Sequence, residues 1–319
     1  MRLSTDQKLS VLCPITKLAL FLLLALTTSF VNADDPADDR PVIMCPTLPL
    51  HSGPVASDEK KRIYQDAVIF RELGRQLVLN VFREEFGLPT RDESLFETID
   101  LTSDHLFEVD VVTIQKGPFK LFVRHKGQQV FYHRLERFFA AGNGHRCANV
   151  LEKVVKPKLV AAIEKLGYKR IKRNKPVTRE YVPLPDLIEK NLRSMNHLKQ
   201  YAALRELHRL IQAEGPSTAR LCGLVRGYAA LSQLTFSTLD SRGEAFAART
   251  MLYGFRARLL IGKSAHISSA DAYADTMLGY SNRAWSNYQY ATKRFASDNI
   301  ESDDWLPLIA DYVLSLIHI

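Results

Sequence analysis

A histidine, an arginine and a cysteine stand together before a helical stretch, and they are the residues in this chain best suited to chemistry. His145, Arg146 and Cys147 follow a Gly-Asn-Gly turn. A helix N-terminus and nearby cations lower the pKa of a thiol and so make it a better nucleophile. Catalysis would also need a base, an orienting partner and an oxyanion hole. No family signature surrounds Cys147, so a disulfide or a buried thiol is the favoured interpretation.

The other cysteines are expected to have structural roles. Cys45 and Cys147 both lie in loop-like surroundings, and we predict a disulfide between them. Cys222 lies in an apolar helical stretch, where a free cysteine behaves as a small buried hydrophobe.

Patterns that mark other common catalytic and metal sites are missing from the sequence. It contains no HExxH, CxxC or GxSxG pattern. The stretch Gly262-Lys263-Ser264 matches the end of a phosphate loop, but Ala257 occupies the place of the required first glycine. We interpret it as a helix stop. The sequence therefore predicts no catalytic residue, no metal and no cofactor.

A basic stretch offers a different kind of site. Residues 153–179 contain ten basic residues and one acidic residue. The centre of this stretch supplies five cations for contact with an anionic surface: Lys169, Arg170, Lys172, Arg173 and Lys175. Its one aromatic residue, Tyr168, makes no base-stacking platform, so nucleic acid is not an expected partner. A solvated face with a charged edge strand is the favoured alternative.

Tyrosines recur at helical spacing in the C-terminal half of the chain. Such spacing is more typical of core packing between helices than of a ligand cage. Those that remain exposed would line a concave groove, where helical arrays bind extended partners. The candidate groove residues are Tyr253, Tyr273, Tyr280 and Tyr288. We expect a protein or peptide partner there.

Residues 57–182 are predicted to form a small α+β domain. Ser57 is a suitable N-cap for a helix whose apolar residues run at helical spacing from Ile63 to Phe82. Apolar and polar residues alternate over 106–114 and 119–124, and a further strand-like segment follows a turn, over 130–133. This pattern predicts an antiparallel hairpin or three-stranded meander. A second helix follows over 149–166, where Pro157 either kinks it or starts a new one.

Residues 183–313 are predicted to be an all-α array of helical hairpins. The prolines at 176, 183 and 185 place the boundary near residue 183. Short loops between the helices favour antiparallel neighbours. The expected helices cover 186–195, 196–213, 217–234, 243–261, 269–280 and 282–296.

The N-terminal residues predict export. Basic residues at 2, 8 and 17 precede the apolar run LALFLLLAL, and Val31-Asn32-Ala33 fits a cleavage site. We therefore predict a signal peptide over 1–33, and an uncleaved anchor is the alternative that would place the chain on a membrane. Residues 34–56, rich in Asp and Pro, predict a flexible or extended leader. The exported chain would be periplasmic or extracellular.

The last six residues, 314–319, have the sequence LSLIHI, typical of a translated sequencing adapter. We predict that they are an artefact. A repeat array usually ends in a helix with a polar outer face. The residues after Asp304 are too apolar for that, which predicts an exposed apolar end near Trp305.

One repeat-like segment resembles a known family. Leu278, Gly279, Ala291 and Phe295 have the spacing of tetratricopeptide signature positions, although Asp275 and Asn282 stand at the family's Trp and Tyr positions. The layout, with ARLCGLVRGYAALSQLT and ARTMLYGFRARLL, also resembles uncharacterised exported bacterial proteins with a C-terminal tetratricopeptide-like array. These resemblances imply a helical-repeat fold and no specific activity.

Three functions remain open from the sequence. The favoured one is an exported scaffold that binds a protein through a helical-repeat groove. The second is an envelope enzyme, hydrolase-like, with a site in residues 57–182 that would gather His145, Cys147 and a carboxylate. The third is attachment to an anionic surface polymer through the basic stretch.

Overall fold

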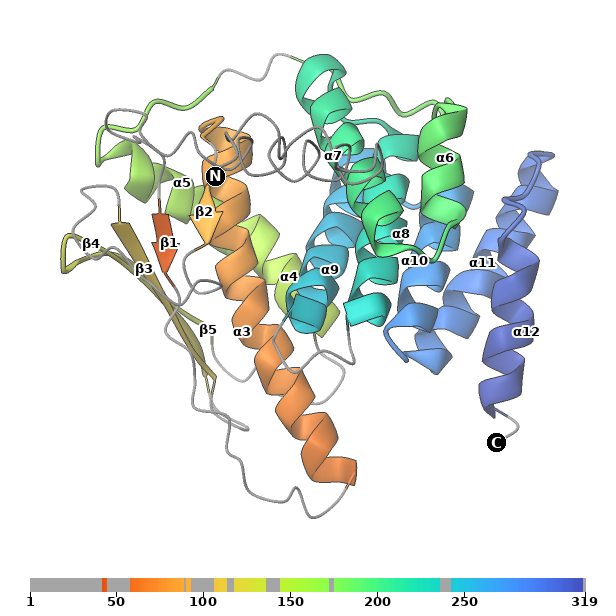
Figure 1. The fold of residues 1–319 in the computed structure, drawn as a ribbon, viewed down its shortest axis with the longest axis horizontal. Coiled ribbons are helices and arrows are strands. Elements are labelled where there is room, and N and C mark those ends of the chain that lie inside the picture. The colour runs from red at the N-terminus through yellow and green to blue at the C-terminus, as the bar shows by residue number, and fades with distance from the viewer. Residues whose placement is uncertain are drawn as a thin grey trace, which may run out of the picture. The chain divides into compact units, whose positions relative to one another are not determined.

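The first described helix, α3 (Asp58–Glu85), lies against the sheet on one side and against α9 (Arg242–Ile261) on the other (Figure 1). The computed structural model describes residues 42–44, 58–88, 90–92, 106–113, 118–135, 144–171, 175–235 and 242–317. The predicted helix after Ser57 is confirmed. Gly74 allows its close approach to the sheet, since a Cβ there would lie 2.8 Å from Val111 Cγ2.

The predicted antiparallel strands are confirmed. They are β3 (Leu106–Thr113), β4 (Phe119–His125) and β5 (Gln128–Leu135), paired in that order. Between β4 and β5, Lys126 and Gly127 both have positive φ angles, +50° and +72°. Two such residues form the tight turn that matches the right-handed twist of a hairpin.

Two short strands were not predicted. β1 (Val42–Met44) and β2 (Arg91–Asp92) extend the sheet in the order β2-β1-β3-β4-β5, with β1 parallel to both neighbours. β1 falls in the predicted leader over 34–56. An extended conformation suits that proline-rich composition, but its pairing depends on partners about 50 to 65 residues away in sequence, which local patterns do not reveal.

Pro157 lies inside a helical run that continues on both sides of it. The segment contains α4 (Gly144–Val150), a π-helical turn η2 (Leu151–Val155) and α5 (Lys156–Glu164). A proline inside such a run removes one intrahelical hydrogen bond, and here a π-helical turn directly precedes it.

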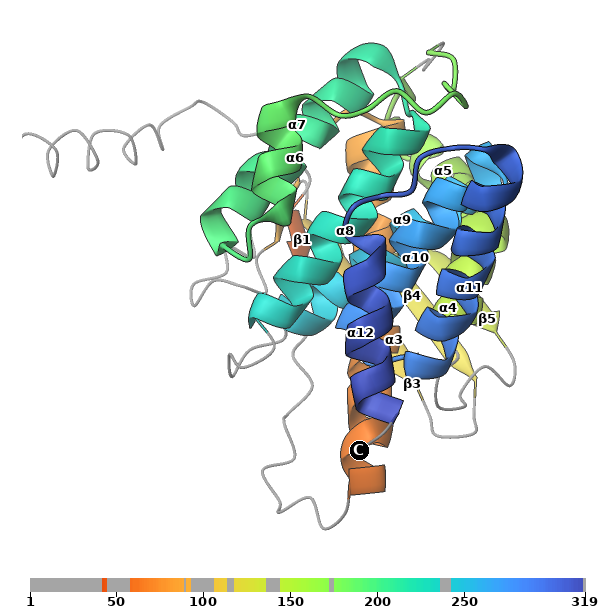
Figure 2. The same ribbon diagram turned by 90° about the vertical axis from the view of Figure 1, so that its right-hand side faces the viewer.

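The region after residue 183 is helical, as expected. It contains α6 (Asp186–Arg193), α7 (His197–Glu214), α8 (Thr218–Thr235), α9, α10 (Ala265–Met277), α11 (Ser281–Asp298) and α12 (Leu306–Ile317). Figure 2 shows α12 in front of α8 and α10. The Asn196 side chain caps α7 by accepting a hydrogen bond from the Lys199 amide at 3.1 Å. Gly262, at φ +97°, ends α9, so the predicted helix stop is confirmed.

The four residues with tetratricopeptide spacing lie in one turn and on the helix that follows it. Leu278 and Gly279 lie in the turn between α10 and α11, and Gly279 has a φ of +77° that stops a helix. Ala291 and Phe295 are buried on α11, where they pack against α12 residues such as Ile309.

The two regions share a hydrophobic core. Residues 41–319 form one compact unit. The core between α3 and the sheet also contains Ala248, Met251 and Leu252 of α9. A second cluster packs α6 to α10 together, and a third packs α10, α11 and α12. The boundary near residue 183 stays a prediction.

None of the helices in the described part of the chain combines the length and the apolar character that crossing a bilayer requires. The predicted signal peptide over 1–33 lies outside the described residues, as do residues 318 and 319.

Candidate functional site

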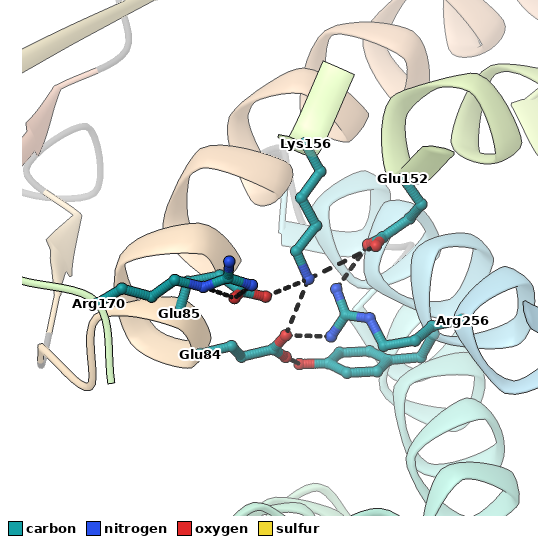
Figure 3. Close-up of polar contacts among 7 residues, drawn as sticks. Glu84, Glu85, Glu152, Lys156, Arg170 and Arg256 are labelled. Carbon is teal, nitrogen blue, oxygen red and sulfur yellow. Dashed lines mark hydrogen bonds and ion pairs between the residues drawn. The ribbon is translucent and has the colours of Figure 1, made fainter. Parts of the chain in front are cut away.

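A buried cluster of charges joins α3, the π-helical turn, α5 and α9 (Figure 3). Arg256 of α9 lies between two carboxylates, Glu84 of α3 and Glu152 of the π-helical turn, and its Nη2 is 2.6 Å from Glu152 Oε1. Lys156 Nζ lies 2.9 Å from Glu85 Oε1 and 3.7 Å from Glu152 Oε2. Each carboxylate therefore has a cationic partner.

Glu84 is ionised at neutral pH in this cluster. Burial would raise its pKa, but the charges of Arg256 and Lys156 and a hydrogen bond from Tyr253 together lower it to about 2. The Tyr253 hydroxyl donates that bond at 2.7 Å. Burial, followed by the charge of Glu84, raises the pKa of Tyr253 well above its ordinary value. A neutral phenol therefore faces a permanent carboxylate.

These charges were not recognised from the sequence. Glu84 and Glu85 are adjacent on a helix, where neighbouring side chains point in different directions and make a poor acid–base pair. In the structure Glu84 accepts from Arg256 and Glu85 accepts from Arg170 at 2.7 Å, but both carboxylates also contact Lys156 Nζ, at 3.8 Å and 2.9 Å. The balance of charges within the cluster is typical of a structural cross-link.

The basic stretch is partly used inside the molecule. Arg170 binds Glu85, and Lys175 donates a hydrogen bond to the carbonyl oxygen of Ala213. Lys169 is exposed, whereas Lys172 and Arg173 lie outside the described residues. Contact with an anionic surface stays a prediction, now with two of its five cations also bound to neighbouring elements.

The four predicted groove tyrosines do not lie on one surface. Tyr253 is 2% exposed and stacks on Tyr228 at 5.5 Å between ring centroids. The prediction that it lines an open groove is therefore wrong, because its ring belongs to the core between α8 and α9. Tyr273 packs edge-on against Trp305, Tyr280 against His145, and Tyr288 stacks on Trp285.

The thiol site of the alternative enzyme hypothesis, with His145 and Cys147 in one pocket, is not assembled. Cys147 is fully buried, and burial raises the pKa of its thiol, which disfavours the nucleophilic thiolate. His145 and Cys147 are two residues apart on α4, so they point about 200° apart around the helix axis. Cys45 lies outside the described residues, and its pairing with Cys147 stays a prediction. Cys222 is also buried, as expected.

His145 nevertheless meets a carboxylate. Its Nε2 lies 3.0 Å from Oδ1 of Asp275, a residue of α10 that is completely buried. Burial disfavours the charge of Asp275, but His145 and Arg283 outweigh it and lower the pKa of the carboxyl group. His145 lines a polar cavity of about 490 Å³, which we call the His145 cavity. Asp275 drew attention in the sequence only because it stands where the repeat family has an aromatic residue.

A second concavity is largely apolar. It encloses about 520 Å³ and is lined by residues of α6, α8, α10 and the start of α12. We call it the Trp305 groove, and its apolar lining is Leu192, Met195, Tyr273, Met277, Trp305, Leu308 and Ile309. Leu308 is 68% exposed, which agrees with the apolar end expected near Trp305.

Among the described residues, no group of three or more His, Cys, Asp or Glu side chains could hold a metal ion. No model of a known protein family matches this chain, and the search of curated proteins finds no match either.

Arg256→Met should strongly destabilise the protein, because it leaves Glu84 and Glu152 buried without their shared partner. We expect a loss of about 3–5 kcal/mol in the free energy of unfolding, measured by urea denaturation. Arg170→Met is the matched control, since Arg170 is 54% exposed and surface ion pairs contribute about 1 kcal/mol or less. Similar losses for the two variants would contradict a structural role for the buried cluster.

Because of His208, the free energy of unfolding should depend on pH. Burial, followed by the charge of Arg83, lowers its pKa from 6.5 to about 4. The folded state favours neutral His208, so this stabilisation is complete above pH 6.5 and is lost as the pH falls toward 4. Between about pH 7 and pH 5 this residue should account for a loss of roughly 2 kcal/mol. In urea titrations, His208→Gln should lose correspondingly less than the unaltered protein, and equal losses would refute the assignment.

Proposed function

We propose that this chain is an exported scaffold protein that binds an apolar segment of another protein in the Trp305 groove. The observation that carries the proposal is the groove itself. It presents exposed apolar side chains, among them Leu308 and Met195, which is 49% exposed. Contiguous exposed apolar surface of this kind is typical of protein interaction sites.

The walls of the groove are fixed on one side and adaptable on the other. Trp305 packs edge-on against Tyr273, and the guanidinium group of Arg226 lies 5.2 Å from the Trp305 ring centroid. Arg193 links α6 to the residue before Trp305 through an ion pair with Asp304 at 3.0 Å. Met195 and Met277 supply flexible, polarisable side chains that adjust to the shape of a partner.

The groove favours a partner in the form of an amphipathic helix. A helix presents apolar side chains at positions i, i+3, i+4 and i+7, and such a row fits a groove between helices. The two arginines that line the groove, Arg193 and Arg226, already bind Glu189. Specificity for the partner therefore comes from its apolar side chains and not from a charge that it carries.

Leu308→Asp should prevent binding, because a carboxylate would be buried against apolar side chains. The test places a photo-crosslinking amino acid at Met195 and compares capture with and without Leu308→Asp. We expect the captured partner to fall by about 30-fold, as for loss of an interface residue worth about 2 kcal/mol. Leu198→Asp is the control, because Leu198 is 79% exposed and does not line the groove. Equal capture by all three proteins would exclude the groove as the binding site.

The predicted export and signal-peptide cleavage can be tested separately. When the full chain is produced in a bacterial host, N-terminal sequencing of the exported protein should begin at Asp34. Ala33→Lys should block this cleavage, because signal cleavage requires a small residue at that position. Protein that keeps Met1 outside the cytoplasm would indicate the uncleaved anchor, and protein found only in the cytoplasm would refute export.

A further inference from the structure

The buried cluster of charges forms one wall of a smaller cavity, which we call the His208 cavity. It measures about 290 Å³, near the lower end of the range for small-molecule sites. α3 contributes Arg83 to its lining, α7 contributes His208, α9 contributes Tyr253, and the segment before α6 contributes Lys175. Four segments that are distant in sequence therefore enclose one small space.

The cations that line the cavity outnumber its carboxylates. The three carboxylates are Glu84, Glu85 and Glu152, and the four cations are Arg83, Lys156, Lys175 and Arg256. Lys156 and Arg256, together with Arg170 outside the lining, bind all three carboxylates. His208, with a pKa of about 4, adds no charge at neutral pH. Counting Arg170, five cations face three carboxylates, so two positive charges remain, those of Arg83 and Lys175.

Arg83 brings one of these two charges to the cavity. Its side chain is partly buried, yet it makes no hydrogen bond or ion pair within the part of the chain that the structure describes. Burial, followed by the charge of Arg83, lowers the pKa of His208, so the guanidinium group lies close enough to act on a residue of the cavity wall. A partly buried cation without a partner is costly, and a bound anion would supply that partner.

Lys175 places the second charge at the C-terminal end of α7. Its Nζ donates a hydrogen bond to the carbonyl oxygen of Ala213, which follows the cavity residue Gln212. A carbonyl oxygen carries no full charge, so this bond does not neutralise the ammonium group. Two of the three donors of the ammonium group remain that no described residue accepts. A cavity with low-dielectric walls and surplus charge of one sign attracts ions of the opposite sign.

The opposite part of the wall is apolar. Ile211 of α7 and Leu259 and Leu260 of α9 line the cavity. Leu259 is 49% exposed, so this apolar surface is open to water. A ligand with an apolar chain would remove it from water, and the gain is proportional to the apolar area buried. The cavity therefore combines unpaired cations with an apolar surface.

We propose that the His208 cavity binds a small anion that carries a short apolar chain. The anionic group lies between Arg83 and Lys175. The chain lies against Ile211, Leu259 and Leu260. Arginine forms paired hydrogen bonds with a carboxylate or a phosphate, and lysine adds a point charge. The Trp305 groove shares no lining residue with this cavity, so each site can fail its test without affecting the other.

The test titrates the purified protein with hexanoate and, separately, with hexyl phosphate. Binding is followed by calorimetry and by the NMR signals of the His208 ring, which His208→Gln identifies by their loss. We expect at least one of the two anions to bind with a Kd of about 1 mM or tighter and to shift those signals. Binding of hexanoate alone would assign a carboxylate, and binding of hexyl phosphate alone a phosphate monoester. Absence of binding for both at about ten times that concentration would overturn the proposal.

Two further probes separate the charge from the chain. Hexanamide keeps the chain without the charge and should bind about 10-fold more weakly than hexanoate, because it cannot form charge-assisted hydrogen bonds as an anion. Acetate keeps the charge without the chain and should also bind about 10-fold more weakly, because it buries little apolar surface. Binding of either probe as tight as that of hexanoate would refute a site for an anion with an apolar chain.

Variants test the assigned cations. Arg83→Gln and Lys175→Gln should each weaken binding by about 10-fold or more, because each removes a positive charge from the cavity. Arg205→Gln removes the same charge from an exposed position on α7 outside the cavity lining and should leave affinity unchanged. Lys175 is exposed, so Lys175→Gln keeps the test decisive if the loss of Arg83 impairs folding. Equal affinities for Lys175→Gln, Arg205→Gln and the unaltered protein would exclude the assigned site.

Discussion

The pairing of Arg256 with Glu84 and Glu152 is the constraint on which this structure depends. A guanidinium group loses a large hydration energy on burial, and only well-placed carboxylates offset it. Here those carboxylates come from α3 and the π-helical turn, which lie 172 and 104 residues away in sequence. Apolar packing between α3 and α9 would tolerate small shifts, whereas this directional contact specifies one register. The α+β region and the helical region are therefore positioned on each other by charge as well as by their shared apolar core.

Elements with a strong local signal could be predicted from the sequence. The apolar spacing of α3, the alternation in β3 and β4, and the Asn196 cap each depend on neighbours within a few residues. β1 could not be predicted, because three residues in a proline-rich segment become a strand only when β3 is beside them. The tyrosines show the same limit. Helical spacing assigns Tyr253 to a helix, but only the packing of α8 on α9 decides that its ring is buried.

Charged residues were the hardest to interpret from the sequence. A glutamate or arginine on a helix is usually solvated. For that reason the burial and pairing of Glu84, Glu152 and Arg256 were not predicted. Arg170 shows the converse case. It stands in a stretch that indicates a free basic surface, yet it neutralises Glu85. At Asp275 the signal was present but ambiguous. A carboxylate at a position that resembles a conserved aromatic site marks either a failed repeat or a new role, and only its contact with His145 distinguishes them.

The geometry of α9 connects the buried cluster to the His145 cavity. Arg256 and Arg258 are two residues apart, so their side chains leave the helix about 200° apart. Arg256 points to Glu84 and Glu152, while Arg258 pairs with Asp271 at the wall of the cavity. Fixing Arg256 therefore also fixes the rotation of α9 that presents Arg258. His145 and Cys147 lie on opposite faces of α4 in the same way. His145 lines the cavity, and Cys147 packs in the core. In both helices, a buried contact on one face determines where the polar side chain on the opposite face is placed.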